Sequence, residues 1–167
     1  MNIQFKPPRI ATHLIWKNPI YFIACGFGIG TFPYMPGTMG TLAAIPIYLV
    51  LAKLSLGFYL FVIVLMQLFG IYACGKMNRD FHTDDHPAAC WDEIAAFPIV
   101  MLSSQPNFIS ITIGFLLFRL FDIWKPWPIR WFDKNVHNGF GVMFDDVLAA
   151  IYSCVLLQLF SYLLNKA

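Results

Sequence analysis

The chain has 167 residues, of which 59% are hydrophobic and 12% are charged, and its formal net charge is +2. Soluble domains usually contain about 25% charged residues. We therefore expect that many of these apolar side chains contact lipid and that the protein core does not bury them all. The small net charge and the scattered basic residues argue against nucleic acid as a partner. The length fits one domain, so residues 1–167 are expected to form a single membrane-embedded unit.

The first apolar segment, residues 20–32, is short and rich in glycine. These properties favour an interfacial or re-entrant segment over a membrane-spanning helix. The sequence "MPGTMG" that follows predicts a turn and then the start of a helix, with Thr38 as a candidate N-cap. The free backbone N–H groups of such a helix start also attract anions, so this segment is either a simple turn and cap or part of an anion site.

A long apolar stretch from residue 42 to 75 contains one charged residue, Lys53. About 34 residues at 1.5 Å each give roughly 50 Å of helix, which is too long for one crossing of a bilayer and enough for two short ones. The sequence "KLSLG" in its middle therefore predicts a helical hairpin, 40–54 and 58–75, with Lys53 at the far membrane surface. A buried hairpin in a soluble helical bundle is the alternative.

The next apolar run, residues 94–121, follows a polar stretch and is broken by "SSQPN" at 103–107. Pro106 and its small polar neighbours indicate a turn between two arms, 92–102 and 108–122. Each arm is too short to span a bilayer comfortably, which favours a shallow helical hairpin. The last apolar run, 145–164, predicts a final helix that begins with Asp145 and Asp146.

The two hairpins place the charged residues on one side of the membrane. All nine acidic residues lie between Asp80 and Asp146, and they would share that face with nine of the eleven Lys and Arg residues, which leaves Lys53 and Lys166 opposite. The positive-inside rule makes the charged face cytoplasmic. The expected fold class is therefore all-α: a compact multi-helical integral membrane protein with short transmembrane helices, helical hairpins and a polar site at the cytoplasmic face.

Paired carboxylates mark two predicted helix starts, Asp92-Glu93 and Asp145-Asp146, and Asp122 lies between them in sequence. Acids at a helix N-terminus are stabilised by the helix dipole, so helix capping alone could explain them. A second carboxylate at each start adds repulsion unless a cation neutralises it, and a hard divalent cation such as Mg²⁺ prefers oxygen ligands. The residues alone leave both interpretations open, capping and a metal site.

The block "FDIWKPWPIRWFDK", residues 121–134, concentrates charge near the third carboxylate. Arg119, Asp122 and Lys125 are spaced by three, so they could share a helical face, either as an ion-pair group or as part of a site. Pro126 disfavours the α conformation at Lys125 and predicts an extended lysine close to Asp122, which would suit a phosphate held near a metal. Nearby aromatic residues are typical of the lipid headgroup level: Trp124, Trp127 and Trp131.

Four segments together resemble bacterial phosphatidylglycerophosphatase A: "PGTMGTLAA", "WDE", "RLFDIWKPWPIRWFD" and "GVMFDDVLA". The resemblance extends from about residue 18 to 164. It implies a Mg²⁺-dependent enzyme of phospholipid biosynthesis that removes the terminal phosphate of phosphatidylglycerophosphate to give phosphatidylglycerol. It also implies a multi-pass protein of the bacterial inner membrane, with membrane lipids as partners and an active site that faces the cytoplasm.

The resemblance and the charge pattern together predict three overlapping sets of site residues. The catalytic set is Asp92, Glu93, Asp122, Lys125 and Asp146. The Mg²⁺ ligands are expected among Asp92, Glu93, Asp122, Asp145 and Asp146, and the substrate-binding residues are Thr38, Arg119 and Lys125.

Two other functions stay open. A lipid enzyme of the CDP-alcohol phosphotransferase type would need an aspartate motif of the form D-x₂-D-G, which is absent. A non-enzymatic lipid-binding or scaffold protein would use its acids only as caps. The sequence specifies no oligomeric state.

Overall fold

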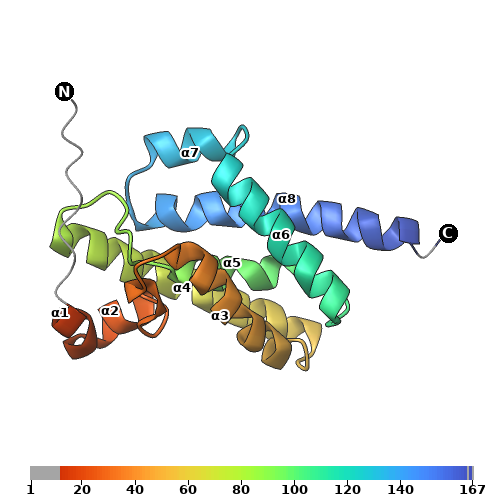
Figure 1. Cartoon of the computed structure of the whole chain (residues 1–167), viewed down its shortest axis with the longest axis horizontal. Coiled ribbons are helices and arrows are strands. Elements are labelled where there is room, and N and C mark those ends of the chain that lie inside the picture. Colours follow the sequence, from red (N-terminus) through yellow and green to blue (C-terminus); the bar gives the residue numbers. More distant parts are fainter. Residues whose placement is uncertain (1–11, 165, 167) are drawn as a thin grey trace.

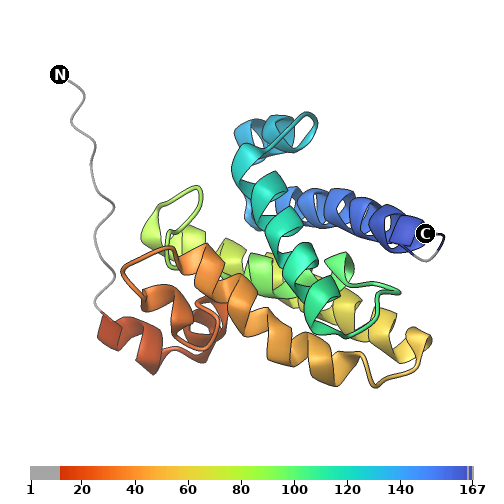
Figure 2. The same ribbon diagram turned by 45° about the vertical axis from the view of Figure 1, so that its right-hand side comes forward.

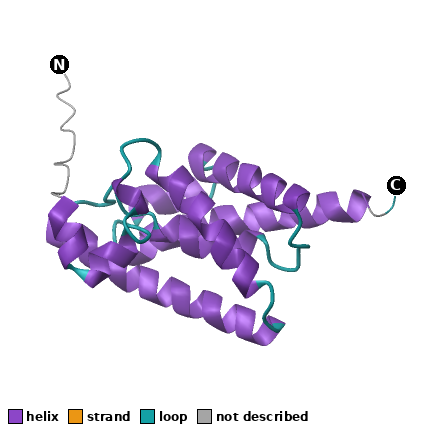
Figure 3. Cartoon of the chain, turned by 60° about the horizontal axis from the view of Figure 1, so that its bottom comes forward, coloured by secondary structure: helices purple, strands orange, loops and turns teal. Residues whose placement is uncertain are grey.

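The computed structural model describes residues 12–164 and 166, and every regular element within this part of the chain is a helix (Figure 3). The N-terminal part contains α1 (Thr12–Lys17), α2 (Pro19–Ala24) and the short 3-10 helix η1 (Ile29–Thr31). Asn18 caps α2, since its side chain accepts a hydrogen bond of 3.0 Å from the backbone N–H of Ile20. The glycine-rich segment therefore folds as two short helical pieces.

The predicted first hairpin is present as α3 (Pro36–Leu51) and α4 (Leu56–Phe81). Lys53 is exposed in the turn between them, as expected. Helix α4 continues six residues beyond the predicted end at residue 75 and ends at Phe81, and His82 caps it in a left-handed conformation. Polar residues after 75 therefore extend the helix instead of ending it.

The two short arms are also present, as α5 (Trp91–Val100) and α6 (Phe108–Trp124). Asn107 caps α6 by accepting a 2.8 Å hydrogen bond from the N–H of Ser110. Two features differ from the prediction. A short helix, α7 (Ile129–Asn135), follows the proline-rich turn, and α8 (Gly139–Leu164) begins six residues before position 145. Asp145 and Asp146 consequently lie beyond the first turn of α8, so the capping interpretation of this pair is wrong.

Helix α8 is the central element of the fold, since it packs against α4, α5, α6 and α7 (Figures 1 and 2). Small side chains allow the close packing, as is common between membrane helices. Gly139 lies so close to α4 that an added Cβ would be 2.1 Å from the carbonyl oxygen of Ile71. Further small residues are fully buried in α5 and α8: Ala95, Ala96, Ala149 and Ala150.

Helices α4 and α8 are long and apolar enough to cross a membrane. Each has 26 residues, which corresponds to about 39 Å of helix and exceeds a hydrocarbon core of about 30 Å. Their exposed faces carry rows of large apolar side chains at helical spacing: Phe61, Leu65, Leu68 and Tyr72 on α4, and Ile151, Val155, Leu159 and Leu163 on α8. The all-helical prediction is confirmed for the described residues, with two candidate membrane-spanning helices.

Candidate functional site

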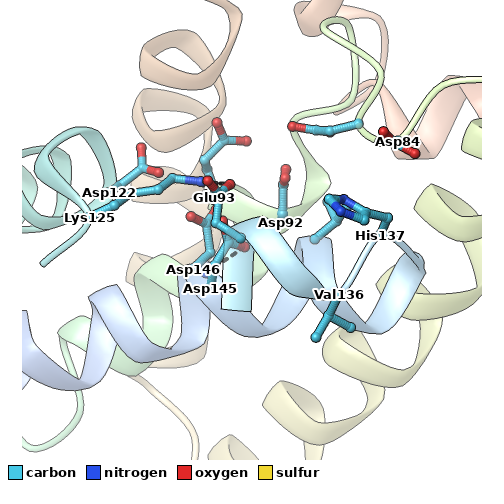
Figure 4. Close-up of a pocket in the computed structure, with 13 residues that line it drawn as sticks. Asp84, Asp92, Glu93, Asp122, Lys125, Val136, His137, Asp145 and Asp146 are labelled. Carbon is cyan, nitrogen blue, oxygen red and sulfur yellow. Dashed lines mark hydrogen bonds and ion pairs between the residues drawn. The ribbon is translucent and has the colours of Figure 1, made fainter. Parts of the chain in front are cut away.

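A cavity of about 300 Å³ lies where the loop 82–90, the C-terminal end of α6, α7 and the first turns of α8 meet (Figure 4). In Figure 1 this region lies toward one end of the molecule, whereas the α3–α4 turn and the end of α8 lie toward the other. Eight of the nine acidic residues of the chain line the cavity, and Lys125 lies among them: Asp84, Asp85, Asp92, Glu93, Asp122, Asp133, Asp145 and Asp146. The acidic residues predicted to share one face therefore gather around one cavity.

Three of these carboxylates form the tightest group. Asp92 and Glu93 belong to the first turn of α5, and Asp146 comes from the facing part of α8. One oxygen from each of the three lies within 4.8 Å of the other two. In the part of the chain that the structure describes, this is the group of acidic, His or Cys side chains that comes close enough to hold a metal ion.

Local contacts explain why α5 presents two adjacent acids at this point. Trp91, the first residue of α5, is buried, and its indole N–H donates a 3.1 Å hydrogen bond to the carbonyl oxygen of Met66 on α4. Gln67 donates a second hydrogen bond, 3.0 Å long, to the carbonyl oxygen of Ala95. These two contacts fix the start of α5 against α4, so that the next two residues, 92 and 93, point toward the cavity.

Two oxygens of this group have no hydrogen-bond partner although they are buried, Oδ1 of Asp92 and Oε2 of Glu93. Burial raises the pKa of both carboxyl groups, and for Glu93 the charge of Asp92 raises it further. Buried polar atoms are rarely left unpaired in folded proteins, and an orphaned one needs an explanation. A hard divalent cation accepts carboxylate oxygens as ligands and supplies the missing positive charge. The donor set therefore fits such a cation.

Asp122 belongs to a neighbouring ion pair. Its Oδ2 lies 2.5 Å from Nη1 of Arg119, and the same nitrogen lies 3.7 Å from Oε1 of Glu93. Glycine at position 37 lets the start of α3 approach this pair, because an added Cβ would lie 2.0 Å from Oε1 of Glu93. The positive end of the α3 dipole therefore faces Glu93.

Thr38 does not have the role that its sequence context predicted. It is the third residue of α3, whereas Met35 is in the N-cap position and provides no side-chain cap. Thr38 is also absent from the residues that line the cavity. The prediction that it caps α3 is wrong. It lies next to Gly37, at the edge of the site. Arg119 does not line the cavity either, but its side chain contacts two residues that do, Asp122 and Glu93.

Lys125 has a different conformation from the one predicted. It ends α6 in the left-handed region, with φ 45° and ψ 63°, and its N–H donates to the carbonyl oxygen of Phe121 at 2.8 Å. A residue in this conformation commonly closes a helix C-terminus. Its ammonium lies 2.5 Å from Oδ1 of Asp133 and 2.6 Å from Oδ2 of Asp145, so it pairs with these two residues and not with Asp122.

The structure thus divides the predicted site residues among three neighbouring contacts. Asp92, Glu93 and Asp146 are the group that could hold a metal, Arg119 pairs with Asp122, and Lys125 pairs with Asp145. Four further polar residues that line the cavity are not among the predicted site residues, although the three acids are predicted to lie on the same face: Asp84, Asp85, Asp133 and His137. Figure 4 shows Asp84 and His137 on the opposite side of Asp92 from Asp122 and Lys125.

Comparisons with known proteins point to one family. The model of the family described as Phosphatidylglycerophosphatase A matches residues 22–161. The chain is 41% identical over 147 residues to the phosphatidylglycerophosphatase A of Escherichia coli (strain K12), an alignment that covers 87% of this chain and 86% of that protein. It is 42% identical over 148 residues to the protein of the same name from Haemophilus influenzae, with 87% and 90% covered.

A third relative has a different name. The putative phosphatidylinositol-3-phosphatase of Bacteroides thetaiotaomicron is 35% identical over 152 residues, with 84% of this chain and 94% of that protein covered. No solved structure matches the chain. The two relatives above 40% identity and the family model each cover most of the sequence, so the chain is a phosphatase and belongs to the phosphatidylglycerophosphatase A family.

Proposed function

We propose that this protein hydrolyses the terminal phosphate of phosphatidylglycerophosphate, with Mg²⁺ as its cofactor, and so forms phosphatidylglycerol in phospholipid biosynthesis. The observation that supports it most directly is the group of three carboxylates with two buried, unpartnered oxygens, Asp92 Oδ1 and Glu93 Oε2, beside a cavity that also contains Lys125. The names of the two closely similar relatives suggest the substrate.

Asp92, Glu93 and Asp146 would hold the Mg²⁺ ion, which when bound neutralises phosphate oxygens and activates or orients a water molecule. In the overall reaction a water oxygen bonds to phosphorus, the bond between phosphorus and the glycerol oxygen breaks, and the glycerol oxygen gains a proton. Lys125 donates a hydrogen bond to a phosphate oxygen, where a fixed positive charge stabilises the negative charge that develops.

The remaining predicted residues would support this arrangement. The guanidinium of Arg119 pairs with Asp122 and lies near Glu93. We therefore assign Arg119 and Asp122 to the part of the site that orients the phosphate. Thr38 lies beside Gly37 at the start of α3, where backbone N–H groups favour a negatively charged ligand. Asp145 is bound to Lys125, and we assign it to holding that lysine instead of ligating the metal.

The surface of the protein supports a membrane location. We propose that α4 and α8 span the bacterial inner membrane and that the cavity faces the cytoplasm. The exposed apolar rows on both helices support contact with lipid. The exposed rings of Trp124, Trp127 and Trp131 near the cavity fit the headgroup level, because tryptophan is enriched there.

The function is tested by phosphate release from phosphatidylglycerophosphate in mixed micelles, with the full chain solubilised in detergent. We expect release in the presence of Mg²⁺, loss of activity after EDTA, and recovery when Mg²⁺ is added back. Activity that persists in EDTA would contradict the proposed cofactor. The absence of phosphate release at every Mg²⁺ concentration would contradict the phosphatase function and favour a lipid-binding role.

The orientation is tested by labelling single cysteines in intact cells, in a variant whose native cysteines are replaced by alanine. Cysteine at position 85 or 137, both exposed near the cavity, should be protected from a membrane-impermeant thiol reagent until the membrane is permeabilised. Cysteine at position 53, in the exposed α3–α4 turn, should be labelled from outside and serves as the control. The orientation is wrong if positions 85 and 137 react in intact cells while position 53 does not.

A further inference from the structure

We infer that Asp133 on α7 is a positioning residue of this site: together with Asp145 it holds the ammonium group of Lys125 in a fixed orientation at the cavity where the phosphate of the substrate binds. The inference rests on the proposed phosphatase function and adds a residue that is not among the predicted site residues. It also gives α7 a function, since this short helix supplies Asp133 to the cavity.

The geometry joins three segments through one side chain. Lys125 lies at the C-terminal end of α6, Asp133 on α7 and Asp145 on α8, and the Nζ atom is 2.5 Å from Oδ1 of Asp133 and 2.6 Å from Oδ2 of Asp145. All three residues line the same cavity. Figure 4 shows Lys125 extending from α6 toward Asp145 and the group formed by Glu93 and Asp146.

The chemistry of an ammonium group explains why two carboxylates would help. A lysine ammonium has three N–H donors and no acceptor. Asp133 and Asp145 use two of these donors. The third remains for a phosphate oxygen, and its direction is set by the other two. A lysine held by one carboxylate could rotate about that contact, so the second carboxylate converts a flexible side chain into a directed donor.

The backbone on both sides of Lys125 is fixed as well. A positive φ of 45° is unfavourable for a lysine and persists only where the surrounding structure holds it. Arg130 on α7 donates a 3.2 Å hydrogen bond to the carbonyl oxygen of Trp124, and the hydroxyl of Tyr152 on α8 donates a 3.3 Å hydrogen bond to that of Trp127. The turn that carries Lys125 is therefore tied to both helices that supply its carboxylate partners.

The two carboxylates also preserve the charge of the lysine. Burial alone would lower the pKa of Lys125, but the charges and hydrogen bonds of Asp145 and Asp133 raise it above its usual value. The two partners differ in exposure, since the side chain of Asp145 is 9% exposed and that of Asp133 is 41% exposed. Asp133 can therefore be replaced with little disturbance of the core, which makes it the better residue to test.

The test compares phosphate release by the parent protein and the variants Asp133→Asn and Asp133→Glu in mixed micelles with saturating Mg²⁺. We expect Asp133→Asn to lower kcat about tenfold, because the ammonium loses one of its two anchors. Asp133→Glu should recover at least half of the parent rate, because it restores a carboxylate. The control is Asp80→Asn, since Asp80 is exposed, pairs with Lys76 and lies outside the cavity, and it should retain the parent rate.

A double-mutant comparison separates positioning from a general structural effect. In a Lys125→Met background, measured at high enzyme concentration, Asp133→Asn should change kcat by less than twofold, since the group that it positions is absent. An equal loss in both backgrounds, or no loss in the parent background, would overturn the inference. Failure of the proposed function would look different, because the parent protein itself would release no phosphate.

Discussion

Asparagine in place of Asp92 or Asp146 is expected to reduce kcat for phosphate release by ~10³-fold or more, equivalent to about 4 kcal/mol of transition-state stabilisation. Both residues contribute an oxygen to the group of three that could hold a metal, and both are buried. The substitution keeps the size of the side chain but removes the negative charge that a bound Mg²⁺ requires. The measurement is kcat in mixed micelles as a function of Mg²⁺ concentration, together with the thermal stability of each variant.

The matched control for these variants is Asp80→Asn, which removes a carboxylate from an exposed ion pair with Lys76. Solvent screens an exposed pair of this kind, and Asp80 lies outside the cavity, so this variant should retain the parent rate. If Asp92→Asn and Asp146→Asn each kept more than a tenth of the parent rate at saturating Mg²⁺, the carboxylates would have no role in metal binding. Their function would then be to stabilise the packing of α5 against α8.

Much of the helical framework could be predicted from the sequence because apolar runs and turn residues alternate clearly. Lys53 with its neighbours marks the α3–α4 turn, and Pro106 marks the α5–α6 turn, each close to its observed place. The start of α8 was harder to predict. The segment 139–144 begins with glycine and has no capping acid, so the pair Asp145-Asp146 looked like the helix start. In the structure Asn138 caps the helix, since its Oδ1 accepts a 2.9 Å hydrogen bond from the N–H of Gly141, and Gly139 packs against α4.

The candidate site could be predicted only in part, and Lys125 shows why. Pro126 disfavours a right-handed α conformation at the residue before it, but both an extended and a left-handed backbone satisfy that restriction. The end of α6 decides between them, because a left-handed residue there lets its N–H bond to the carbonyl of Phe121. The choice depends on where the helix ends, which the local sequence does not state.

The partners of Lys125 depend on tertiary structure. Asp133 and Asp145 are 8 and 20 residues away in sequence, and neither separation corresponds to neighbours on one helix. Their contact with Lys125 requires α7 to fold back onto α8, which no periodic pattern in residues 129–135 predicts. By contrast, Asp92 and Glu93 could be identified because they are adjacent in sequence and precede an apolar helix.

Replacement of Lys125 by alanine or by arginine is expected to remove most of kcat, by ~10²-fold or more for alanine. This loss, about 3 kcal/mol, is typical when one fixed donor to a developing negative charge is deleted. Arginine keeps the charge, but its planar guanidinium cannot satisfy Asp133, Asp145 and a phosphate oxygen with the geometry of a compact ammonium. The alanine variant also leaves the carboxylates of Asp133 and Asp145 without the cation that they share.

The control for this prediction is Lys134→Ala, since Lys134 is exposed on α7 next to Asp133 and does not line the cavity. It should turn over phosphatidylglycerophosphate at nearly the parent rate.

The informative comparison is between kcat and KM. If Lys125 serves only to attach the turn 124–128 to the membrane surface, its replacement would change KM for substrate in micelles and leave kcat intact. If Lys125 instead stabilises the transferring phosphate, its replacement lowers kcat itself, because that interaction strengthens only as charge develops. An unchanged kcat in Lys125→Ala would therefore exclude Lys125 from the chemistry and leave the "KPWP" segment with an anchoring role alone.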